Sequence, residues 1–518
     1  MKMRVLAGVF VCVLGLPMGA AVAQPCGAVV TFADAVAPTR ELHVAVNGSN
    51  ATGDGTAARP LATIVAAAQR ATPGTAIRVH AGTYSGGMFI ANLAGTAGAP
   101  IWIGGVAGEA RPVIQGGGNG IQFSRARYVV VHDLEVRGAT GNGLNCDDGG
   151  EYSNADASGF LVLRNLFIHD IGSGGNNDGL KLSGIYDFWV VGCEVARCGG
   201  AASGSLVDMV GCHRGVIARN FLHEASANAL QIKGGTSHID VLWNRMEECG
   251  ERAVNIGGST GLEFFRPPVS QTGVNAEARN IRVVGNVIQG GTCAVAFVGA
   301  VDSVVSNNTI VTPHNWILRI LQETVTQGGY TFAACGNSVF ENNLVYFERA
   351  DLSTYVNVGA NTAPTTFMFR NNLWYAYDNP AASNPNLPVA ETNGVRGVNP
   401  LLETALPQAG ASYKPAANGP AVGAGRGPAL VSGDFVSRCY AAEPSIGAYE
   451  AARVCGTSDF NGDGDSGTDQ DIEAFFACIG GNCCAACWGG GADFNGDGDT
   501  GTDQDIEAFF RVLGGLAC

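Results

Sequence analysis

The 518-residue chain is predicted to be an all-β solenoid of parallel strands followed by a small α-helical module. Three observations predict this. Short segments that alternate apolar and polar residues recur at spacings near 23 residues, glycine supplies 75 residues, and one 18-residue acidic segment occurs twice near the C-terminus. A fixed period with glycine at the corners is typical of stacked coils.

The first 23 residues are predicted to be a secretory signal peptide. A basic start (MKMR) precedes a short apolar run and the small residues AVA before Gln24. The run is too short to span a bilayer, and no later apolar stretch is long enough. We therefore expect a secreted protein, extracellular or associated with the cell surface, with domains at 24–450 and 451–518.

The negative charge is concentrated in the C-terminal module. From Gly456 to Cys518 twelve acidic residues accompany one arginine, a net charge of −11, whereas the other 455 residues carry −4 of the total −15. This balance argues against nucleic acid as a partner.

Cysteines also differ between the two parts. The body is expected to bury Cys146, Cys193 and Cys249 as free thiols, and the cysteine-rich tail is expected to form disulfides among Cys455, Cys478, Cys483, Cys484, Cys487 and Cys518.

Aligning the repeated segments places outward-facing residues in two columns, because alternate side chains of a strand point to opposite faces. The first column is Gln122, Asn145, Lys181, Asp208, Gln231, Asn255, Ala296 and Arg319. The second is Ser124, Asp147, Ser183, Val210, Lys233, Gly257, Val298 and Leu321. A further register is expected to hydrogen-bond from coil to coil through Asp133, Asn165, Cys193, Asn220, Asn244, Asn286, Asn308, Asn343 and Asn372.

Both ends of the body carry a family resemblance. Residues Leu42–Tyr84 indicate a strand, a loop, a short helix around Thr63–Ala71 and a second strand, and the body closes with PSIGAYE (Pro444–Glu450). These segments resemble the ends of secreted right-handed parallel β-helix proteins, in which the helix plugs the open end of the coil. The resemblance implies that fold for residues 24–450.

Polar residues gather on the central coils, where a site is expected. The candidate catalytic residues are Lys233, Arg252, Lys181 and His213. The candidate substrate-binding residues are Asn145, Gln231, Asn255, Arg214, His223 and Arg266. A Ca²⁺ site is a hypothesis for Asp147, Asp148, Asp178 and Asp208. The alternatives are an Asx turn for each aspartate, a solvated face for each Lys or Arg, and a turn cap for each histidine.

The central segment Gln231–Gly258 is similar to the chondroitinase B and alginate lyase family, in which a Lys base on one coil is followed by an Arg about one coil later. "NNDGLKL" resembles the Ca²⁺-assisted pectate lyases. These resemblances imply β-elimination on a uronic-acid polysaccharide, with a Lys or Arg removing the proton and a cation neutralising the carboxylate. The alternatives are a glycoside hydrolase that uses Asp178 and Asp208, and a non-catalytic glycan-binding or surface scaffold.

The doubled acidic segment has the spacing of a Ca²⁺ loop. In the first copy Asp459, Asn461, Asp463 and Gly464 occupy loop positions one, three, five and six, Asp465 offers its carbonyl, and Asp471 supplies a late carboxylate. The second copy repeats this with Asp493, Asn495, Asp497, Asp499 and Asp505. An apolar helical face follows each loop. The tandem resembles a type I dockerin, which implies bound Ca²⁺ and a cohesin-like or cell-surface protein as partner; the alternative is a Ca²⁺-stiffened secretion or anchoring tag without a cohesin.

Overall fold

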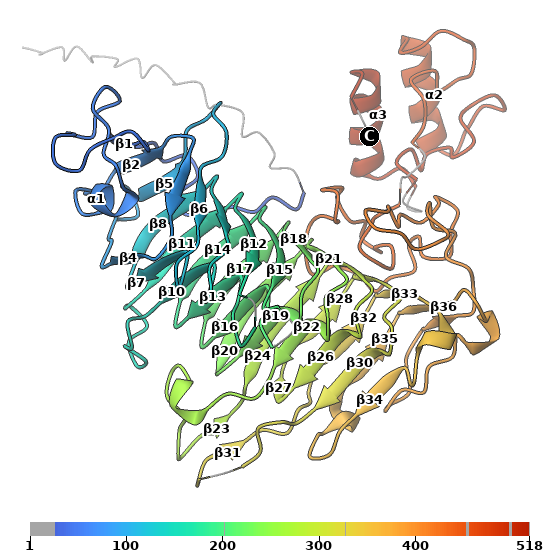
Figure 1. Ribbon diagram of the computed structural model, residues 1–518. Helices are drawn as coiled ribbons and strands as arrows, with labels where there is room; N and C mark the ends of the chain where they lie inside the picture. Colours follow the sequence, from blue (N-terminus) through green and yellow to red (C-terminus); the bar gives the residue numbers. More distant parts are fainter. Residues whose placement is uncertain are drawn as a thin grey trace, which may run out of the picture.

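The body is a right-handed parallel β-helix built from three long sheets, as predicted (Figure 1). The computed structural model describes residues 26–172, 174–200, 203–326, 328–451, 455–496 and 500–516, so the expected signal peptide lies outside the described residues. Within that part of the chain, no helix is both long and apolar enough to cross a membrane.

Sheet I contains one strand from almost every coil. Its strands, in spatial order, are β1 (Arg40–Val44), β2 (Thr75–Val79), β5 (Ile101–Gly105), β8 (Arg127–His132), β11 (Gly159–Arg164), β14 (Tyr186–Val191), β17 (His213–Ala218), β20 (Thr236–Leu242), β24 (Ala278–Val284), β28 (Val304–Ser306), β32 (Val339–Glu341) and β35 (Met368–Arg370), with β27 (Ala300–Val301) paired to β24.

Sheet II contains the strands that were aligned from the sequence. They are β4 (Met88–Ala91), β7 (Ile121–Ser124), β10 (Leu144–Asp147), β13 (Leu180–Ser183), β16 (Val207–Val210), β19 (Asn228–Lys233), β22 (Arg252–Gly257), β26 (Cys293–Val298), β30 (Trp316–Leu321) and β34 (Val356–Val358).

Sheet III completes the triangular coil. Its strands are β3 (Thr83–Ser85), β6 (Val113–Gln115), β9 (Glu135–Arg137), β12 (Phe167–Ile171), β15 (Glu194–Cys198), β18 (Phe221–His223), β21 (Arg245–Glu247), β25 (Val287–Gln289), β29 (Thr309–Val311), β33 (Leu344–Phe347), β36 (Leu373–Ala376) and β37 (Val395–Arg396). A two-stranded sheet pairs β23 (Val274–Asn275) with β31 (Thr331–Phe332). Short 3₁₀ turns are η1 (Leu262–Phe264), η2 (Arg349–Asp351), η3 (Pro364–Thr366) and η4 (Pro380–Ala382).

The predicted strand register is observed over most of sheet II. Asn145 pairs with Gln122 on one side and with Lys181 on the other. The second column departs from the prediction at β22, where the register to β19 shifts between Gln231 and Ile232. Ile232, rather than Lys233, therefore pairs with Gly257. An irregularity of this kind changes the direction in which the neighbouring side chains point.

Asparagines hydrogen-bond from coil to coil inside the solenoid, but from a later coil than the sequence predicted. The Asn220 amide oxygen accepts the backbone N–H of Cys193. On each later coil the amide oxygen accepts the backbone N–H and the amide N–H₂ of the previous asparagine, in the column Asn220, Asn244, Asn286, Asn308, Asn343 and Asn372. Asp133 and Asn165 also bond to each other from coil to coil, but outside the core column, because they lie in the left-handed backbone region one residue before the buried Leu134 and Leu166.

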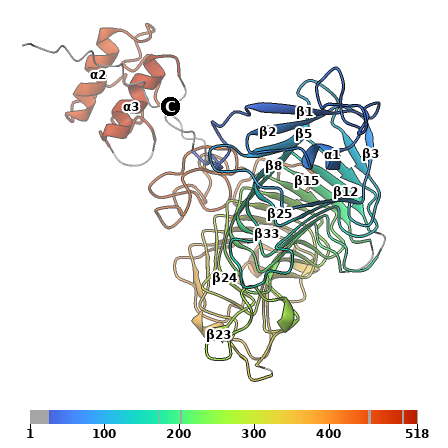
Figure 2. The same cartoon turned by 90° about the vertical axis from the view of Figure 1, so that its left-hand side faces the viewer.

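The N-terminal end of the solenoid is closed as expected. Thr63 caps α1 (Ile64–Ala68) by accepting the N–H of Ala66, and Ile64 and Ala67 are fully buried in the main core. Figure 2 shows α1 beside the first strands of the coil. The helix covers the end coil of the solenoid and so removes that coil's apolar surface from water.

The first described residues lie on sheet I and are bonded to the far end of the body. Phe32 packs against Tyr128, Phe160 and Trp189, and Cys26 forms a disulfide with Cys439, 413 residues away in sequence. This disulfide was not predicted. The expected free thiols Cys146, Cys193 and Cys249 are buried and unbonded.

Two helices, α2 (Asp469–Ile479) and α3 (Asp503–Leu513), form the tail module. Its core consists of Phe475 and Phe509 from the helices and of Phe460 and Phe494 from the loops before them. The neighbouring Phe476 and Phe510 do not join this core and are 43% and 48% exposed. Two expected tail disulfides form, Cys478–Cys483 and Cys484–Cys487.

Candidate functional site: a groove on sheet II

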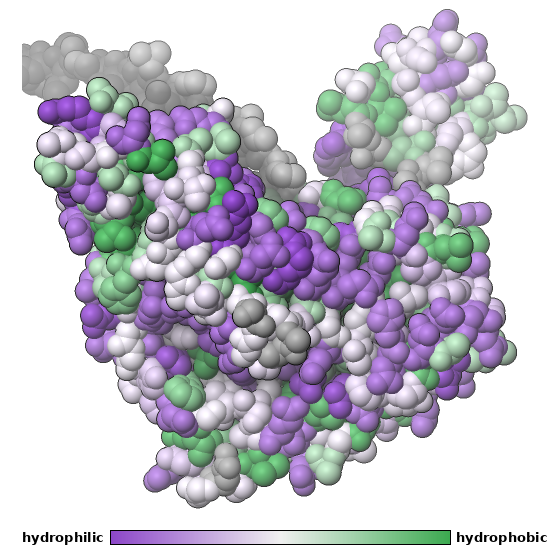
Figure 3. Space-filling view, viewed as in Figure 1, coloured by the Kyte–Doolittle hydropathy of each residue, from purple (hydrophilic) through white to green (hydrophobic). Residues whose placement is uncertain are grey.

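A groove of about 690 Å³ runs along the outer face of sheet II. The groove floor is formed by every second residue of each strand, because alternate side chains point outward. In β13, for example, Leu180 and Leu182 are buried while Lys181 and Ser183 face the groove. Hydrophilic residues cover much of the molecular face seen in Figure 3, with hydrophobic ones scattered among them. The groove is lined by Phe89, Gln122, Ser124, Asn142, Asn145, Asp147, Asp148, Gly149, Gly150, Tyr152, Asn176, Lys181, Ser183, Val210, Lys233, Ser259, Thr260, Gly261, Phe264 and Arg266.

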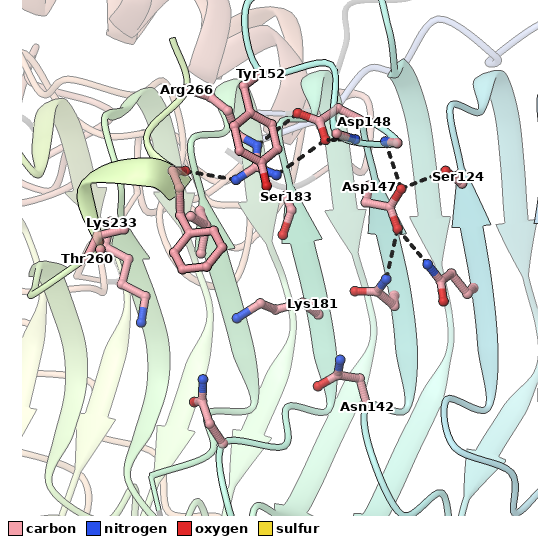
Figure 4. A pocket seen from close by; sticks show the side chains of 18 of the residues that line it. Ser124, Asn142, Asp147, Asp148, Tyr152, Lys181, Ser183, Lys233, Thr260 and Arg266 are labelled. Carbon is pink, nitrogen blue, oxygen red and sulfur yellow. Dashed lines mark hydrogen bonds and ion pairs between the residues drawn. The ribbon is translucent and has the colours of Figure 1, made fainter. Parts of the chain in front are cut away.

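Two lysines extend toward one another across this floor (Figure 4). The Lys181 ammonium contacts the Oδ2 atoms of Asp208, closely, and of Asp178, at 3.1 Å. The Lys233 ammonium lies 3.9 Å from the same Asp208 Oδ2, which is its one ion-pair contact within the described residues. Lys181 is therefore held in place, whereas Lys233 is free to approach a ligand.

The two carboxylates beneath the lysines are almost completely buried. Asp178 is 0% exposed and Asp208 is 1% exposed, and neither lines the groove. Burial, together with the neighbouring Asp208 charge, raises the pKa of Asp178 to about 6. Burial acts to lower the pKa of Lys181, but Asp208 and Asp178 outweigh it and the pKa is raised. Lys181 is thus a fixed cation at neutral pH.

The side wall is built from the insertion between β22 and β24. Arg266 is 6% exposed and donates from Nε to Asp148 Oδ2 at 2.8 Å, and its guanidinium lies 4.0 Å from the centre of the Tyr152 ring. Glu277, fully buried, accepts the backbone N–H groups of Thr260 (2.9 Å) and Gly234 (3.0 Å). These contacts fix the wall beside Lys233.

The aspartates on the groove side do not fit a Ca²⁺ site. Asp147 accepts from Ser124, Gln122, Asn145 and the backbone of Gly149. Asp148 is bound to Arg266, and the deeper pair is bound to Lys181. Because their oxygens already have donors or cations, the four residues do not converge on one ion. Around the groove, the described residues contain no group of three or more His, Cys, Asp or Glu side chains arranged to hold a metal.

Other predicted site residues lie away from the groove. Arg252 pairs with Asn228, five residues before Lys233, which separates them by roughly 16 Å along the strand. The expected closeness of Lys233 and Arg252 is therefore not observed; instead Arg252 contacts Asn255 and Glu323. Gln231 and Asn255 are buried and bonded to each other.

The remaining three candidates belong to the other sheets. His213 is buried on β17, where its ring nitrogens contact Ser237 Oγ at 2.8 Å and the Arg266 carbonyl at 3.0 Å. Burial lowers the pKa of His213 to about 4. Arg214 pairs with Asp187 on sheet I, and His223 contacts Glu194 and Glu224 on sheet III.

Sequence reasoning missed Phe89, Asn142, Tyr152 and Thr260, which all line the groove. Asn142 had a detectable signal, because polar residues recur three positions before the first column. Their side chains accept the next coil's backbone N–H: Asn119 from Asn142 at 3.0 Å, Asn142 from Asp178 at 2.9 Å, and Asp178 from Ser205 at 2.8 Å. Tyr152 and Thr260 come from loops with no repeat.

In the tail, the first acidic loop retains the expected order of oxygen donors. Asp459 accepts the N–H groups of Asp463 and Gly464, both at 3.1 Å, while Asn461 accepts the N–H of Asp463 at 2.9 Å. Asp471 is fully buried and forms a capping box with Thr468 at the start of α2. Hard oxygen atoms at this spacing suit Ca²⁺ in chemistry. The second loop includes Asp497 and Asp499, which lie outside the described residues.

Comparison with known proteins gives likenesses of fold only. No family model matches the chain, and no curated protein matches it. Among solved structures, pectate lyase Pel9A is similar with 16% identity and a TM-score of 0.49, over 80% of this chain and 98% of that one. An alginate lyase from Paenibacillus sp. has 15% identity and a TM-score of 0.42 over 62% and 98%. A structure titled glycoside hydrolase has 10% identity and a TM-score of 0.47 over 64% and 96%. Since one fold hosts many activities, these likenesses assign none.

Proposed function

We propose that the protein is a secreted, polysaccharide-active enzyme that cleaves an anionic, uronic-acid glycan by β-elimination in the sheet II groove. The observation that carries this proposal is that one of the two groove lysines is tightly ion-paired and the other is not. Lys181 is held by two buried carboxylates, whereas Lys233 has one contact at 3.9 Å and faces the same cavity.

The two lysines divide the chemistry between them. The fixed Lys181 ammonium attracts the uronate carboxylate, which makes the proton on the adjacent carbon more acidic. Lys233, as the free amine, accepts that proton; the released electron pair forms the carbon–carbon double bond and expels the glycosidic oxygen. The resulting Lys233 ammonium can return the proton to the departing oxygen. No step requires a metal ion in the groove.

Burial of the carboxylates counts against the hydrolase alternative. A glycosidase requires two carboxyl groups that flank the scissile bond. Asp178 and Asp208 are 0% and 1% exposed and lie behind Lys181, and Asp147 accepts four hydrogen bonds within the groove floor. None of these three carboxylates is placed to protonate a sugar oxygen without rearrangement.

The tail is proposed to attach the enzyme through Ca²⁺-dependent docking to a cohesin-like or cell-surface protein. Two equivalent phenylalanines, Phe476 and Phe510, are exposed on α2 and α3 with ring centroids 6.4 Å apart. Such a paired apolar surface suits a protein partner. The disulfides of the body and tail support export, because disulfides persist in oxidising compartments.

A substrate screen tests the function directly. The purified protein is incubated with polygalacturonate, alginate and chondroitin sulfate, and ultraviolet absorbance of an unsaturated uronate is followed together with reducing ends. We expect absorbance and reducing ends to rise together with at least one polymer. Reducing ends without absorbance would support hydrolysis, and binding without either product would support a scaffold.

A further inference from the structure

An exposed phenylalanine lies at the N-terminal end of the groove floor. Phe89 on β4 pairs with Gln122, Gln122 pairs with Asn145, and Asn145 pairs with Lys181. Phe89 is therefore the first member of the column that contains Lys181. Three coil steps separate them, or about 14 Å at the usual strand spacing of about 4.8 Å.

The Phe89 ring is turned toward solvent although it is large and apolar. Its neighbours Met88 and Ile90 are buried in β4, and Phe89 itself is 58% exposed. It makes no ring–ring or cation–π contact with the described residues. The same cavity that reaches Lys233 is lined by Phe89, so the ring faces the groove that contains the lysines.

A second exposed aromatic ring stands at the wall near Lys233. Phe264 is 47% exposed and lines the groove, and its carbonyl accepts a hydrogen bond from Arg266 at 2.8 Å. Arg266 is itself anchored to Asp148. The backbone that carries the Phe264 ring is thus anchored through a buried ion pair, while the backbone of Phe89 is part of the sheet.

Between the two rings the floor of the groove is polar. Gln122, Asn145 and Asp147 form one hydrogen-bonded group on β7 and β10. Apolar faces at the ends of a row of amide and carboxylate groups match a chain of sugar rings, since each ring has an apolar face and a hydroxyl edge.

We infer that Phe89 forms a distal stacking subsite for a sugar ring, and that the groove binds an extended polymer along the solenoid axis rather than a short oligosaccharide. This inference rests on the proposed uronate substrate. A sugar unit in an extended chain spans about the distance between coils, about 4.8 Å, so a ring on Phe89 lies about three units from the ring at Lys181. Ligands that are too short to span both positions gain nothing from Phe89.

Binding of a length series tests this subsite. Calorimetric titration uses oligogalacturonates and oligomannuronates from dimer to octamer and the two parent polymers. The full chain carries Lys233→Met, so that ligands are not consumed. Phe89→Ala is compared with Phe89→Trp, which keeps an aromatic face, and with Phe476→Ala, a matched exposed phenylalanine in the tail.

We expect Phe89→Ala to weaken binding of long chains about tenfold and to leave the dimer unchanged. Phe89→Trp and Phe476→Ala should bind all lengths like the parent. Equal affinities of Phe89→Ala and its parent for long chains, or equal losses at every length, overturn the subsite while leaving the lyase proposal intact. If no uronate ligand binds the parent or wild-type chain, the proposed substrate class is wrong and the subsite falls with it.

Discussion

Asp208 lies in register with Lys181 on the next coil, and its Oδ2 contacts the ammonium groups of both Lys181 and Lys233. One buried carboxylate therefore lies beneath both lysines of the groove floor. Lys181 has a second carboxylate, Asp178, at 3.1 Å, and Lys233 does not. In the proposed mechanism this difference suits Lys181 to bind the uronate carboxylate and Lys233 to transfer the proton.

Replacing Asp208 should disturb both stability and turnover. Asp208→Asn keeps the shape but removes the charge that compensates Lys181, and breaking a buried ion pair typically costs about 3 kcal/mol or more. We expect Asp208→Asn to lower the unfolding free energy by about that amount, as measured by urea unfolding. Asp187→Asn removes the partly exposed partner of the exposed Arg214 and should cost less than about 1 kcal/mol. Equal small losses would contradict the proposed role of Asp208.

Stability should depend on pH through Asp178. Its folded pKa of about 6 lies above the reference value of 3.8, so between these pH values the folded state binds more protons than the unfolded state. The unfolding free energy contributed by Asp178 therefore rises as pH falls from 6 toward 4, by on the order of 2 kcal/mol. Asp178→Asn should abolish this contribution when urea midpoints are compared at about pH 4.5 and about pH 7. An identical pH dependence in the variant would contradict it.

His213 should contribute with the opposite sign. Its folded pKa of about 4 lies below the reference value of 6.5, so the unfolded state binds more protons between these values. The contribution of His213 is present above pH 6.5 and is lost as pH falls toward 4. His213→Gln should therefore resist mild acid better than wild type in the same urea titrations, relative to its own stability at neutral pH. No relative gain would show that His213 is not kept neutral by burial.

The two cations that the sequence placed together should now behave differently. Lys233→Ala should abolish turnover and leave the melting temperature nearly unchanged, because among the described residues its ammonium has one ion-pair contact, at 3.9 Å. Arg252→Ala removes hydrogen bonds to Asn255 and Glu323 and should lower stability by about 1–2 kcal/mol while leaving measurable turnover. Steady-state kinetics with thermal melts check both; turnover by Lys233→Ala equal to wild type would reject its assignment as the base.

Calcium binding by the tail can be measured on the full chain. We expect about two ions by titration calorimetry, one for each loop. Asp459→Ala should remove one ion and Asp493→Ala the other, whereas Asp187→Ala in the body should remove none. If a variant with both Asp459→Ala and Asp493→Ala still bound two ions, these aspartates would not be ligands.

The sequence predicted the solenoid well because its period depends on local alternation, which each coil repeats. It predicted the neighbours of Asn145 and Lys181 correctly for the same reason. It failed at Lys233 and Arg252, because residues 19 apart in sequence lie at opposite ends of their strands and spacing does not reveal which end faces a groove. Tyr152 and Arg266, 114 positions apart, meet through loops whose course follows no repeat.

The Cys26–Cys439 disulfide makes the body a covalently closed ring of 414 residues, although its chain is linear. In the chain-entropy description, closing so long a loop disfavours the unfolded ensemble by roughly 6 kcal/mol. The disulfide also limits the effect of proteolysis. After one cut in a surface loop between the two cysteines, the two fragments stay joined by the disulfide and remain paired along every sheet. A single cut of that kind therefore shortens no coil and releases no fragment.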